Sequence, residues 1–312
     1  MLPSLLRLQP RNPTTATPLD PETIFSAALG TIFTDDVRNQ HGDPENVIVY
    51  NSVYGELEFR TSDPVKEEGR RRFAHYLWNA GVLLGEVIGG RGVRPGGERD
   101  REWSGMEEGD KREGDEGRRW WISREEEERW GVKSERVLEL GAGVGLAGIV
   151  SVLAGAEEVT ISDYPAPEVL ATLAENVSTN VSGHLRYRVN IEGHEWGDLS
   201  TPFALANAGR YTRILAADCL WMPDEHHNLA TSMLHFLSPA EDARVLVMAG
   251  FHTGRAKLAP FFEVVGQEGL EVEEIWEMDA DGERREWMTE REGEGVAERK
   301  KWTVAAKLKR KH

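Results

Sequence analysis

The fold is decided by the sequence VLELGAGVG at residues 137–145, in which an apolar run passes directly into a glycine-rich loop. Apolar residues continue to about Ala154, so the segment predicts a buried strand, a tight turn and the start of a helix. Gly141, Gly143 and Gly145 allow positive φ angles and leave room for a ligand against the backbone, because they carry no Cβ. The segment therefore predicts a ligand-binding crevice at the carboxyl edge of a sheet.

Further strand and helix patterns alternate on both sides of this loop. We expect strands at residues 136–140, 158–162, 185–189, 212–217, 244–249, 271–278 and 302–307, and helices at residues 73–88, 146–154, 168–180, 224–237 and 257–267. This α/β alternation indicates βαβ units, which form a mostly parallel sheet with helices on both faces. The last two strands follow one another without a helix and predict a C-terminal antiparallel hairpin. Period-two alternation at residues 46–59 predicts an N-terminal β-hairpin.

Charged residues are concentrated in two stretches of the chain. The 312 residues include 37 Lys and Arg against 54 Asp and Glu, a net charge of −17. Residues 91–130 and 279–301 are rich in both signs of charge and bury too little apolar surface to offset their chain entropy. We expect a single domain at residues 46–312 with these stretches as solvated insertions, after a mostly flexible segment at residues 1–45. The end of the first insertion, SREEEERWG, predicts a short exposed helix.

Composition and cysteine content exclude several classes of protein. The acidic net charge argues against sequence-independent binding of nucleic acid or anionic lipid, and no apolar run approaches the roughly 18 to 20 residues of a membrane helix. Cys219 is the single cysteine, so neither an intramolecular disulfide nor a Cys-rich zinc site can form. The rings of His226 and His227 would point apart on a helix, which leaves no metal site beside Glu225. We expect a cytoplasmic monomer without a metal.

The residues around the glycine loop distinguish between nucleotide ligands. A dinucleotide fingerprint has a third glycine where Leu146 stands. Glu139, just before the loop, would repel phosphates and suits a ligand that carries an ammonium group. Asp163 follows the next strand, where a carboxylate can accept both ribose hydroxyls, and Tyr164 could lie against an adenine face. These features favour S-adenosylmethionine over NAD; the alternative is a glycine turn with Asp163 as a helix cap.

Several ordered motifs carry a resemblance to a known family. They are LWNAG at residues 77–81, VLELGAGVGLAGI at 137–149, SDYP at 162–165, HEWGD at 194–198 and AADCLWMPDEHH at 216–227. The chain resembles the class I S-adenosylmethionine-dependent methyltransferases, and within them the methyltransferase-like family of protein lysine methyltransferases. It is most similar to their fungal nicotinamide N-methyltransferase-like branch, which includes N-terminal and lysine methyltransferases of a translation elongation factor. The resemblance implies a Rossmann-like, seven-stranded, mostly parallel sheet.

The resemblance also implies roles for individual residues. On the cofactor side it implies that Trp78 contacts the cofactor and that Gly141, Ala142 and Gly143 surround its methionine part. It also implies that Asp163 binds the ribose, that Trp196 lies beside the adenine, and that Ala217 lies at the cofactor's edge. The family's acceptor motif, Asp or Glu followed at the fourth position by Tyr or Phe, falls on DCLW at residues 218–221. Trp221 keeps an aromatic wall there but lacks the hydroxyl of a tyrosine.

Methyl transfer to an amine needs alignment, exclusion of water and loss of the acceptor's proton, and no covalent nucleophile. Asp218 could anchor the incoming ammonium or help to remove its proton, and Trp221 could hold the cationic nitrogen by cation–π attraction. We therefore expect an N-methyltransferase that acts on a Lys side chain or N-terminal amine of a basic protein, such as a translation factor. The alternatives are methylation of a small nicotinamide-like amine and a non-catalytic cofactor-binding interaction protein.

Overall fold

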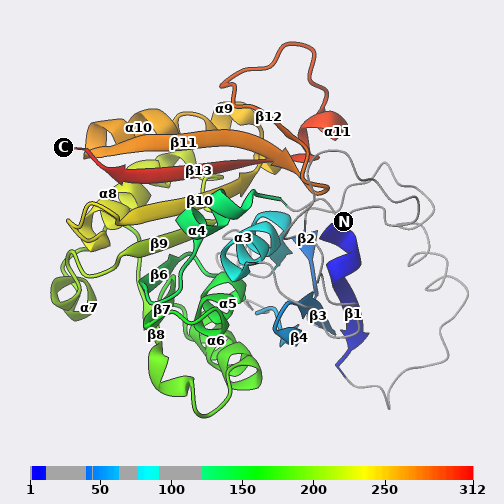
Figure 1. Ribbon diagram of the computed structural model, residues 1–312, viewed down its shortest axis with the longest axis vertical. Coiled ribbons are helices and arrows are strands. Elements are labelled where there is room, and N and C mark those ends of the chain that lie inside the picture. The colour runs from blue at the N-terminus through cyan, green and yellow to red at the C-terminus, as the bar shows by residue number, and fades with distance from the viewer. Residues whose placement is uncertain (1, 12–39, 44, 63–75, 91–120, 312) are drawn as a thin grey trace, which may run out of the picture.

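The computed structural model describes residues 2–11, 40–43, 45–62, 76–90 and 121–311 (Figure 1). Its strands are β1 (Leu6–Pro10), β2 (Gln40–His41), β3 (Asn46–Ser52), β4 (Gly55–Phe59), β5 (Leu77–Trp78), β6 (Arg136–Leu140), β7 (Glu158–Asp163), β8 (Val189–Gly193), β9 (Arg213–Ala217), β10 (Arg244–Gly250), β11 (Leu270–Asp279), β12 (Arg284–Glu286) and β13 (Trp302–Arg310). Its α-helices are α3 (Asn79–Gly89), α4 (Arg124–Trp130), α5 (Leu146–Leu153), α6 (Pro167–Asn180), α7 (Pro202–Ala206), α8 (His226–Phe236), α9 (Arg255–Leu258), α10 (Phe261–Glu268) and α11 (Val296–Arg299). None of these helices has the length and apolar character that a membrane span requires.

The large sheet has eight strands in the order β12-β11-β13-β10-β9-β6-β7-β8. The strands from β8 to β10 are parallel, whereas β13 pairs antiparallel with both β10 and β11. This confirms the expected α/β fold, its C-terminal antiparallel hairpin and its N-terminal hairpin of β3 and β4. The strand order reverses at β6 and β9, where open α/β sheets bind ligands. The short edge strand β12 is an addition to the expected sheet.

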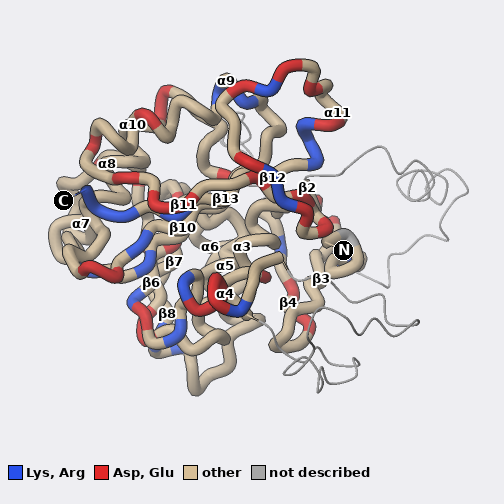
Figure 2. Tube along the Cα trace, turned by 45° about the horizontal axis from the view of Figure 1, so that its top comes forward, with Lys and Arg blue, Asp and Glu red and all other residues tan. Residues whose placement is uncertain are grey.

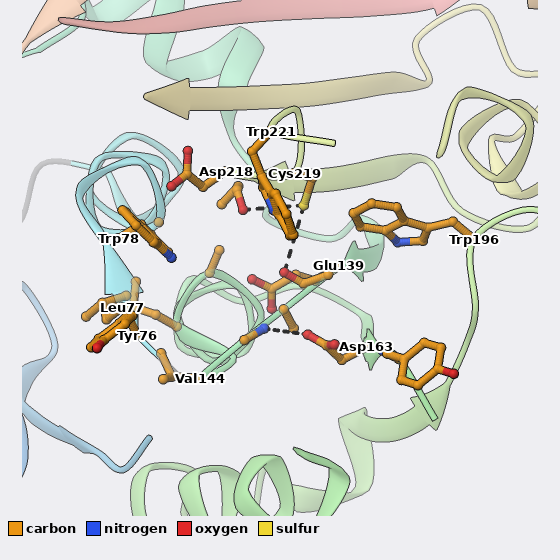
Figure 3. Close-up of a pocket in the computed structure, with 18 of the residues that line it drawn as sticks. Tyr76, Leu77, Trp78, Glu139, Val144, Asp163, Trp196, Asp218, Cys219 and Trp221 are labelled. Atoms are coloured by element: carbon orange, nitrogen blue, oxygen red, sulfur yellow. Dashed lines mark hydrogen bonds between the residues drawn. The ribbon is translucent and has the colours of Figure 1, made fainter. Parts of the chain in front are cut away.

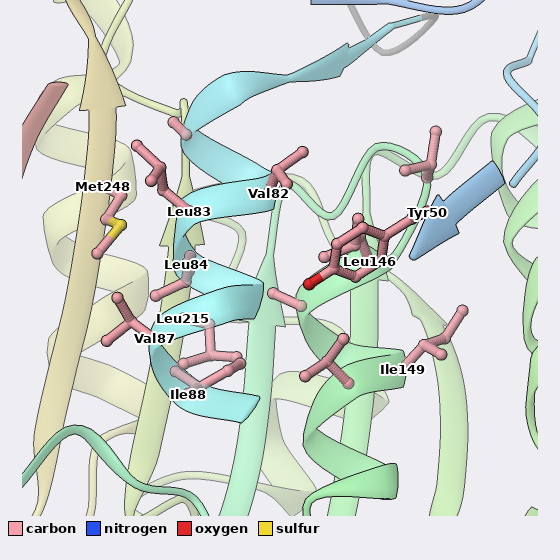
Figure 4. Packing of buried hydrophobic residues seen from close by; sticks show 14 of the residues in the cluster. Tyr50, Val82, Leu83, Leu84, Val87, Ile88, Leu146, Ile149, Leu215 and Met248 are labelled. Carbon is pink, nitrogen blue, oxygen red and sulfur yellow. The ribbon is translucent and has the colours of Figure 1, made fainter. Parts of the chain in front are cut away.

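The central strands are buried on both faces of the sheet. Successive residues of a strand face opposite sides, so they pack in two different hydrophobic clusters. On β10, Leu246 and Met248 pack in the hydrophobic cluster that includes α3 and α5, while Val245 and Val247 pack in the cluster that includes α8 and α10. Figure 4 shows the first cluster, where side chains of α3 lie between those of β10 and α5. Burial on two faces explains why these strands are nearly continuous apolar runs. The strands β6 to β10 are parallel, so their carboxyl ends lie along one edge of the sheet.

The N-terminal residues that the structure describes are ordered, contrary to the expectation of a mostly flexible segment. Strand β1 pairs with β3 in a three-stranded sheet of order β1-β3-β4. The preceding 3₁₀ helix (Leu2–Leu5) buries Leu2 and Leu5, and the Leu2 N–H donates to the carbonyl of Ala280 at 3.2 Å. The expectation of flexibility is therefore wrong for residues 2–11, and residues 12–39 lie outside the described residues.

Three elements differ in position from the patterns that indicated them. Strand β8 begins at Val189, where the expected strand ends, because a 3₁₀ turn (Arg186–Arg188) precedes it. The helix expected at residues 257–267 is divided into α9 and α10 at Pro260, which is the N-cap of α10 and cannot continue a preceding helix. Helix α3 begins at Asn79 because Leu77–Trp78 pair as a strand with β2; residues 73–75 lie outside the described residues.

The two charge-rich stretches differ in structure. Of the first, residues 91–120 lie outside the described residues, and the expected short helix is α4, which begins with a capping box of Ser123 and Glu126 and buries Trp130. In the second, most residues from 281 to 301 are exposed, but the Glu294 carboxylate is buried against Arg255 at 2.7 Å. Figure 2 shows both signs of charge along the segment from β12 to α11. Pairing of opposite charges orders this stretch.

Candidate functional site

The glycine loop follows β6 and has the backbone that its sequence requires. Gly141, Gly143 and Gly145 have φ angles of +64°, +58° and +79°, in the left-handed region that glycine adopts most readily. A Cβ on Gly141 would lie 2.8 Å from Sγ of Cys219 and 2.9 Å from Cζ2 of Trp196. The loop therefore fits closely against both side chains, and glycine at position 141 is required by space as well as by φ.

Glu139 lies on β6 beneath the loop and is buried. Its Oε2 accepts a hydrogen bond from the Gly148 N–H at 2.8 Å. Burial raises the pKa of Glu139 to about 8, because a charged carboxylate loses its hydration there. A cation bound in the pocket beside Glu139 would favour the ionised form and lower this pKa again.

Asp163 ends β7 and is hydrogen-bonded to the glycine loop. Its Oδ2 accepts from the Gly143 N–H at 2.7 Å and its Oδ1 accepts from the Tyr164 N–H at 2.7 Å. Figure 3 shows the first of these bonds. A carboxylate oxygen can accept more than one hydrogen bond. These bonds orient the Asp163 carboxylate, which lines the pocket.

The other end of the pocket is built on the carboxyl ends of β9 and β10. Asp218 has a φ of +58°, an uncommon conformation for a residue with a side chain and one that clusters at functional sites. Its Oδ1 accepts from the Gly250 N–H at 2.9 Å, and Nδ1 of His252 lies 3.6 Å from its Oδ2. Burial raises the pKa of Asp218 above its usual range. The His252 ring stacks on Trp78 with centroids 4.3 Å apart.

One pocket contains every site residue that the sequence indicated (Figure 3). The cofactor-side residues that line it are Trp78, Glu139, Gly141, Ala142, Gly143, Asp163, Tyr164, Trp196 and Ala217, and the acceptor-side residues are Asp218 and Trp221. They come from segments far apart in the sequence, which the sheet edge brings together. Within the described ranges, no group of three or more His, Cys, Asp or Glu side chains is arranged to hold a metal ion.

Comparison with known proteins gives the family. Residues 62–268 match the model of a family described as lysine methyltransferase. The chain belongs to this family. The matched range contains every lining residue of the pocket and excludes the sheet of β1, β3 and β4. The pocket is therefore a feature of the family domain, and the N-terminal sheet is outside the part that defines the family.

Individual relatives carry more specific names. A Gibberella zeae protein named protein N-terminal and lysine N-methyltransferase EFM7 is 28% identical over 49% of this chain and 63% of its own length. A Schizosaccharomyces pombe protein of the same name is 28% identical over 66% of this chain and 68% of its own. A solved glycopeptide N-methyltransferase, MtfA, aligns with a TM-score of 0.45 and 16% identity over 60% of this chain and 88% of its own. The chain thus matches less than two thirds of the Gibberella zeae relative.

Several lining residues of this methyltransferase-family pocket were not indicated by the sequence as site residues. Tyr76 and Leu77 line it beside Trp78, and Met222 lines it beside Trp221. Their adjacency to two indicated tryptophans was the available signal. His194 also lines the pocket, and its Nε2 is 2.9 Å from Oγ of Ser232. Burial lowers the pKa of His194 to about 4, so its ring is neutral at physiological pH.

Proposed function

We propose that the protein is an S-adenosylmethionine-dependent N-methyltransferase that methylates a Lys side chain or an N-terminal amine of a protein. The observation that carries the proposal is the division of one pocket into two ends. Glu139 and Asp163 line the pocket beside the glycine loop, and Asp218 lies near Trp78 and Trp221 (Figure 3). The first end suits a nucleoside that carries an ammonium group, and the second suits an amine acceptor.

The residues present fit the cofactor by their donor and acceptor chemistry. Asp163 would accept the ribose hydroxyls, Glu139 would neutralise the ammonium group, and Trp196 and Tyr164 would cover the adenine. The absence of a Cβ at Gly143, whose nearest protein neighbour would be 3.9 Å away, leaves backbone open to the methionine part. When bound, S-adenosylmethionine supplies an electrophilic methyl group on a sulfonium.

The acceptor end has the groups that an amine needs. A protonated Lys or N-terminal ammonium must lose a proton before its nitrogen has a free electron pair. The buried Asp218 carboxyl can anchor the ammonium and receive that proton, because burial favours its protonated form. Trp221 lines the same end and would attract the cation through its ring face. Closure of the site by these aromatic rings would exclude water.

The names of the relatives support a protein as the substrate. The net charge of −17 suits a basic partner, because complementary charge speeds encounter. We infer a translation factor as the substrate, a monomeric enzyme, a cytoplasmic location and no role for nucleic acid or membranes. We also propose that residues 46–312 form a single domain, on which strand β1 packs through its pairing with β3.

The test measures the transfer of labelled methyl groups to the proteins in an extract of cells that lack the gene for this protein. Wild-type protein and S-adenosylmethionine with a labelled methyl group should place the label in protein bands, and Asp218→Asn protein should not. Label in small molecules alone would replace the protein substrate with a nicotinamide-like amine. Binding of S-adenosylhomocysteine without any transfer would support a non-catalytic interaction protein and contradict the proposal.

The raised pKa of Glu139 predicts how cofactor affinity depends on pH. Below a pKa of about 8 the free protein holds Glu139 protonated, whereas a bound ammonium group favours the ionised form, so binding releases a proton. The affinity for S-adenosylmethionine should rise by up to about tenfold per pH unit between pH 5.5 and 7, by linkage. The cofactor's amino group stays protonated in this window, since α-amino groups titrate near 7.7 to 8.0.

Calorimetric titrations across this pH range would measure the effect. Glu139→Gln removes the titrating group and keeps an acceptor for the Gly148 N–H, so its affinity should be weaker at pH 7 and nearly independent of pH. An unchanged pH dependence in Glu139→Gln would show that Glu139 does not face the ammonium group.

A further inference from the structure

Asn176 connects the glycine loop to the N-terminal sheet. It lies on α6 and is 1% exposed. Its Nδ2 donates to the carbonyl of Val144, in the glycine loop, at 3.0 Å and to the carbonyl of Arg60, just after β4, at 2.9 Å. Its Oδ1 accepts from the Arg60 N–H at 2.8 Å. One amide side chain thus bonds both to the pocket wall and to a sheet outside the family-defining residues.

The bond to Val144 is made where the loop becomes helix α5. If α5 began one residue earlier, the Val144 carbonyl would accept from the Gly148 N–H, four residues on. Gly148 donates to Glu139 instead, and the Val144 carbonyl accepts from Asn176. These two side chains therefore hold the end of the loop in its unwound form. Val144 itself lines the pocket, so the loop's conformation determines the shape of the pocket.

Asn180, one turn further along α6, makes the same kind of bonds without reaching the loop. Its Oδ1 accepts from the Glu58 N–H at 2.8 Å, and its Nδ2 donates to the Glu58 carbonyl at 2.7 Å. The two asparagines cover the outer edge of β4, which has β3 on its other side. Covering an edge strand is a sufficient role for Asn180. The bond to Val144 distinguishes Asn176 from it.

We propose that Asn176 is a positioning residue of the cofactor site, and that the sheet of β1, β3 and β4 supports the glycine loop through it. The inference rests on the proposed function, because it assigns S-adenosylmethionine to the pocket. Arg60 fixes both polar atoms of the Asn176 amide, which orients the remaining N–H of Nδ2 toward Val144. The N-terminal strands are thereby part of the cofactor site although none of their side chains lines it.

The test compares Asn176→Ala with Asn180→Ala in the full chain. Asn176→Ala loses two bonds to Arg60 and the buried bond to Val144, and Asn180→Ala loses two bonds to Glu58. The midpoint of thermal unfolding should therefore fall in both variants, and further in Asn176→Ala. Asn176→Ala should weaken S-adenosylhomocysteine binding by at least about tenfold, the scale of one lost buried hydrogen bond, and Asn180→Ala by less than about twofold. Asn176→Asp serves if the alanine variant does not fold, since it keeps the acceptor for the Arg60 N–H and removes the donor to the Val144 and Arg60 carbonyls.

A second measurement does not depend on the cofactor. Amide hydrogen exchange in the free protein should become faster at residues 141–145 in Asn176→Ala and stay as in wild type there in Asn180→Ala. Equal weakening of binding in both variants, or wild-type binding in Asn176→Ala, would overturn the positioning role while the proposed function stands. A wild-type protein that binds no S-adenosylhomocysteine would overturn the proposed function and this inference with it.

Discussion

Asp218→Asn should lower the rate of methyl transfer by about 10²- to 10³-fold, the range typical of a lost general base, and leave the affinity for S-adenosylmethionine within about twofold of wild type. The substitution keeps the shape of the side chain and an acceptor for the Gly250 N–H. Asparagine also tolerates the left-handed backbone at this position, whose φ is +58°. What it removes is the carboxylate that we propose as the anchor of the acceptor ammonium and the acceptor of its proton.

Single-turnover kinetics with saturating cofactor would measure this effect. Asp198→Asn is the matched control, because Asp198 is exposed, belongs to the HEWGD motif and lies outside the pocket lining. It removes the same charge and should leave the rate within about twofold. An Asp218→Asn enzyme with a rate near wild type would contradict the role of Asp218 and move the proton acceptor elsewhere.

Asp163→Ala should weaken the binding of S-adenosylmethionine by about 10²- to 10³-fold. Two hydrogen bonds to a charged carboxylate are lost at the ribose, and each contributes about 1.5 to 3 kcal/mol. In the wild-type protein the carboxylate also accepts hydrogen bonds from the N–H groups of Gly143 and Tyr164, and the alanine variant loses both bonds. The loss therefore combines missing contacts with a less well-ordered loop. Isothermal titration calorimetry with S-adenosylhomocysteine would measure it.

Asp163→Asn separates the two contributions to that loss. It keeps one oxygen for the loop and the shape of the side chain but replaces the charged acceptor, so its affinity should lie between those of wild type and Asp163→Ala. Thermal unfolding of the free proteins serves as the control for folding. Unchanged affinity in Asp163→Ala would show that Asp163 only caps the loop, which is the alternative that its place after a strand leaves open.

The ligand edge could be predicted because its residues follow buried strands. Glu139 is the penultimate residue of β6, Asp163 ends β7 and Asp218 follows β9. The carboxyl ends of parallel strands meet at one edge of the sheet. For these residues, spacing along the chain and position in space are linked by the regular geometry of the βαβ unit. Trp221 is different, because its departure from the Tyr or Phe of the acceptor motif was visible only through the resemblance to the family.

The sequence pattern does not indicate residues whose role depends on contacts with distant segments of the chain. Asn176 stands in an ordinary helical pattern, and its partners Arg60 and Val144 are backbone groups from two other segments. Glu294 lies in a stretch whose high charge indicates a solvated loop, yet Arg255 and Arg285 surround it. Opposite charges can neutralise one another in a buried cluster, and composition alone does not reveal such pairing.

The central claim is that this pocket transfers a methyl group to a protein amine. The most direct measurement is mass spectrometry of proteins treated with wild-type enzyme and S-adenosylmethionine carrying a deuterated methyl group, with Asp218→Asn enzyme in parallel. The account predicts deuterated methyl groups on a Lys Nζ or an N-terminal nitrogen in the wild-type sample, reduced at least about 10²-fold in the variant. Deuterated methyl on no protein amine, or on the same amines at equal rate with both enzymes, would contradict it.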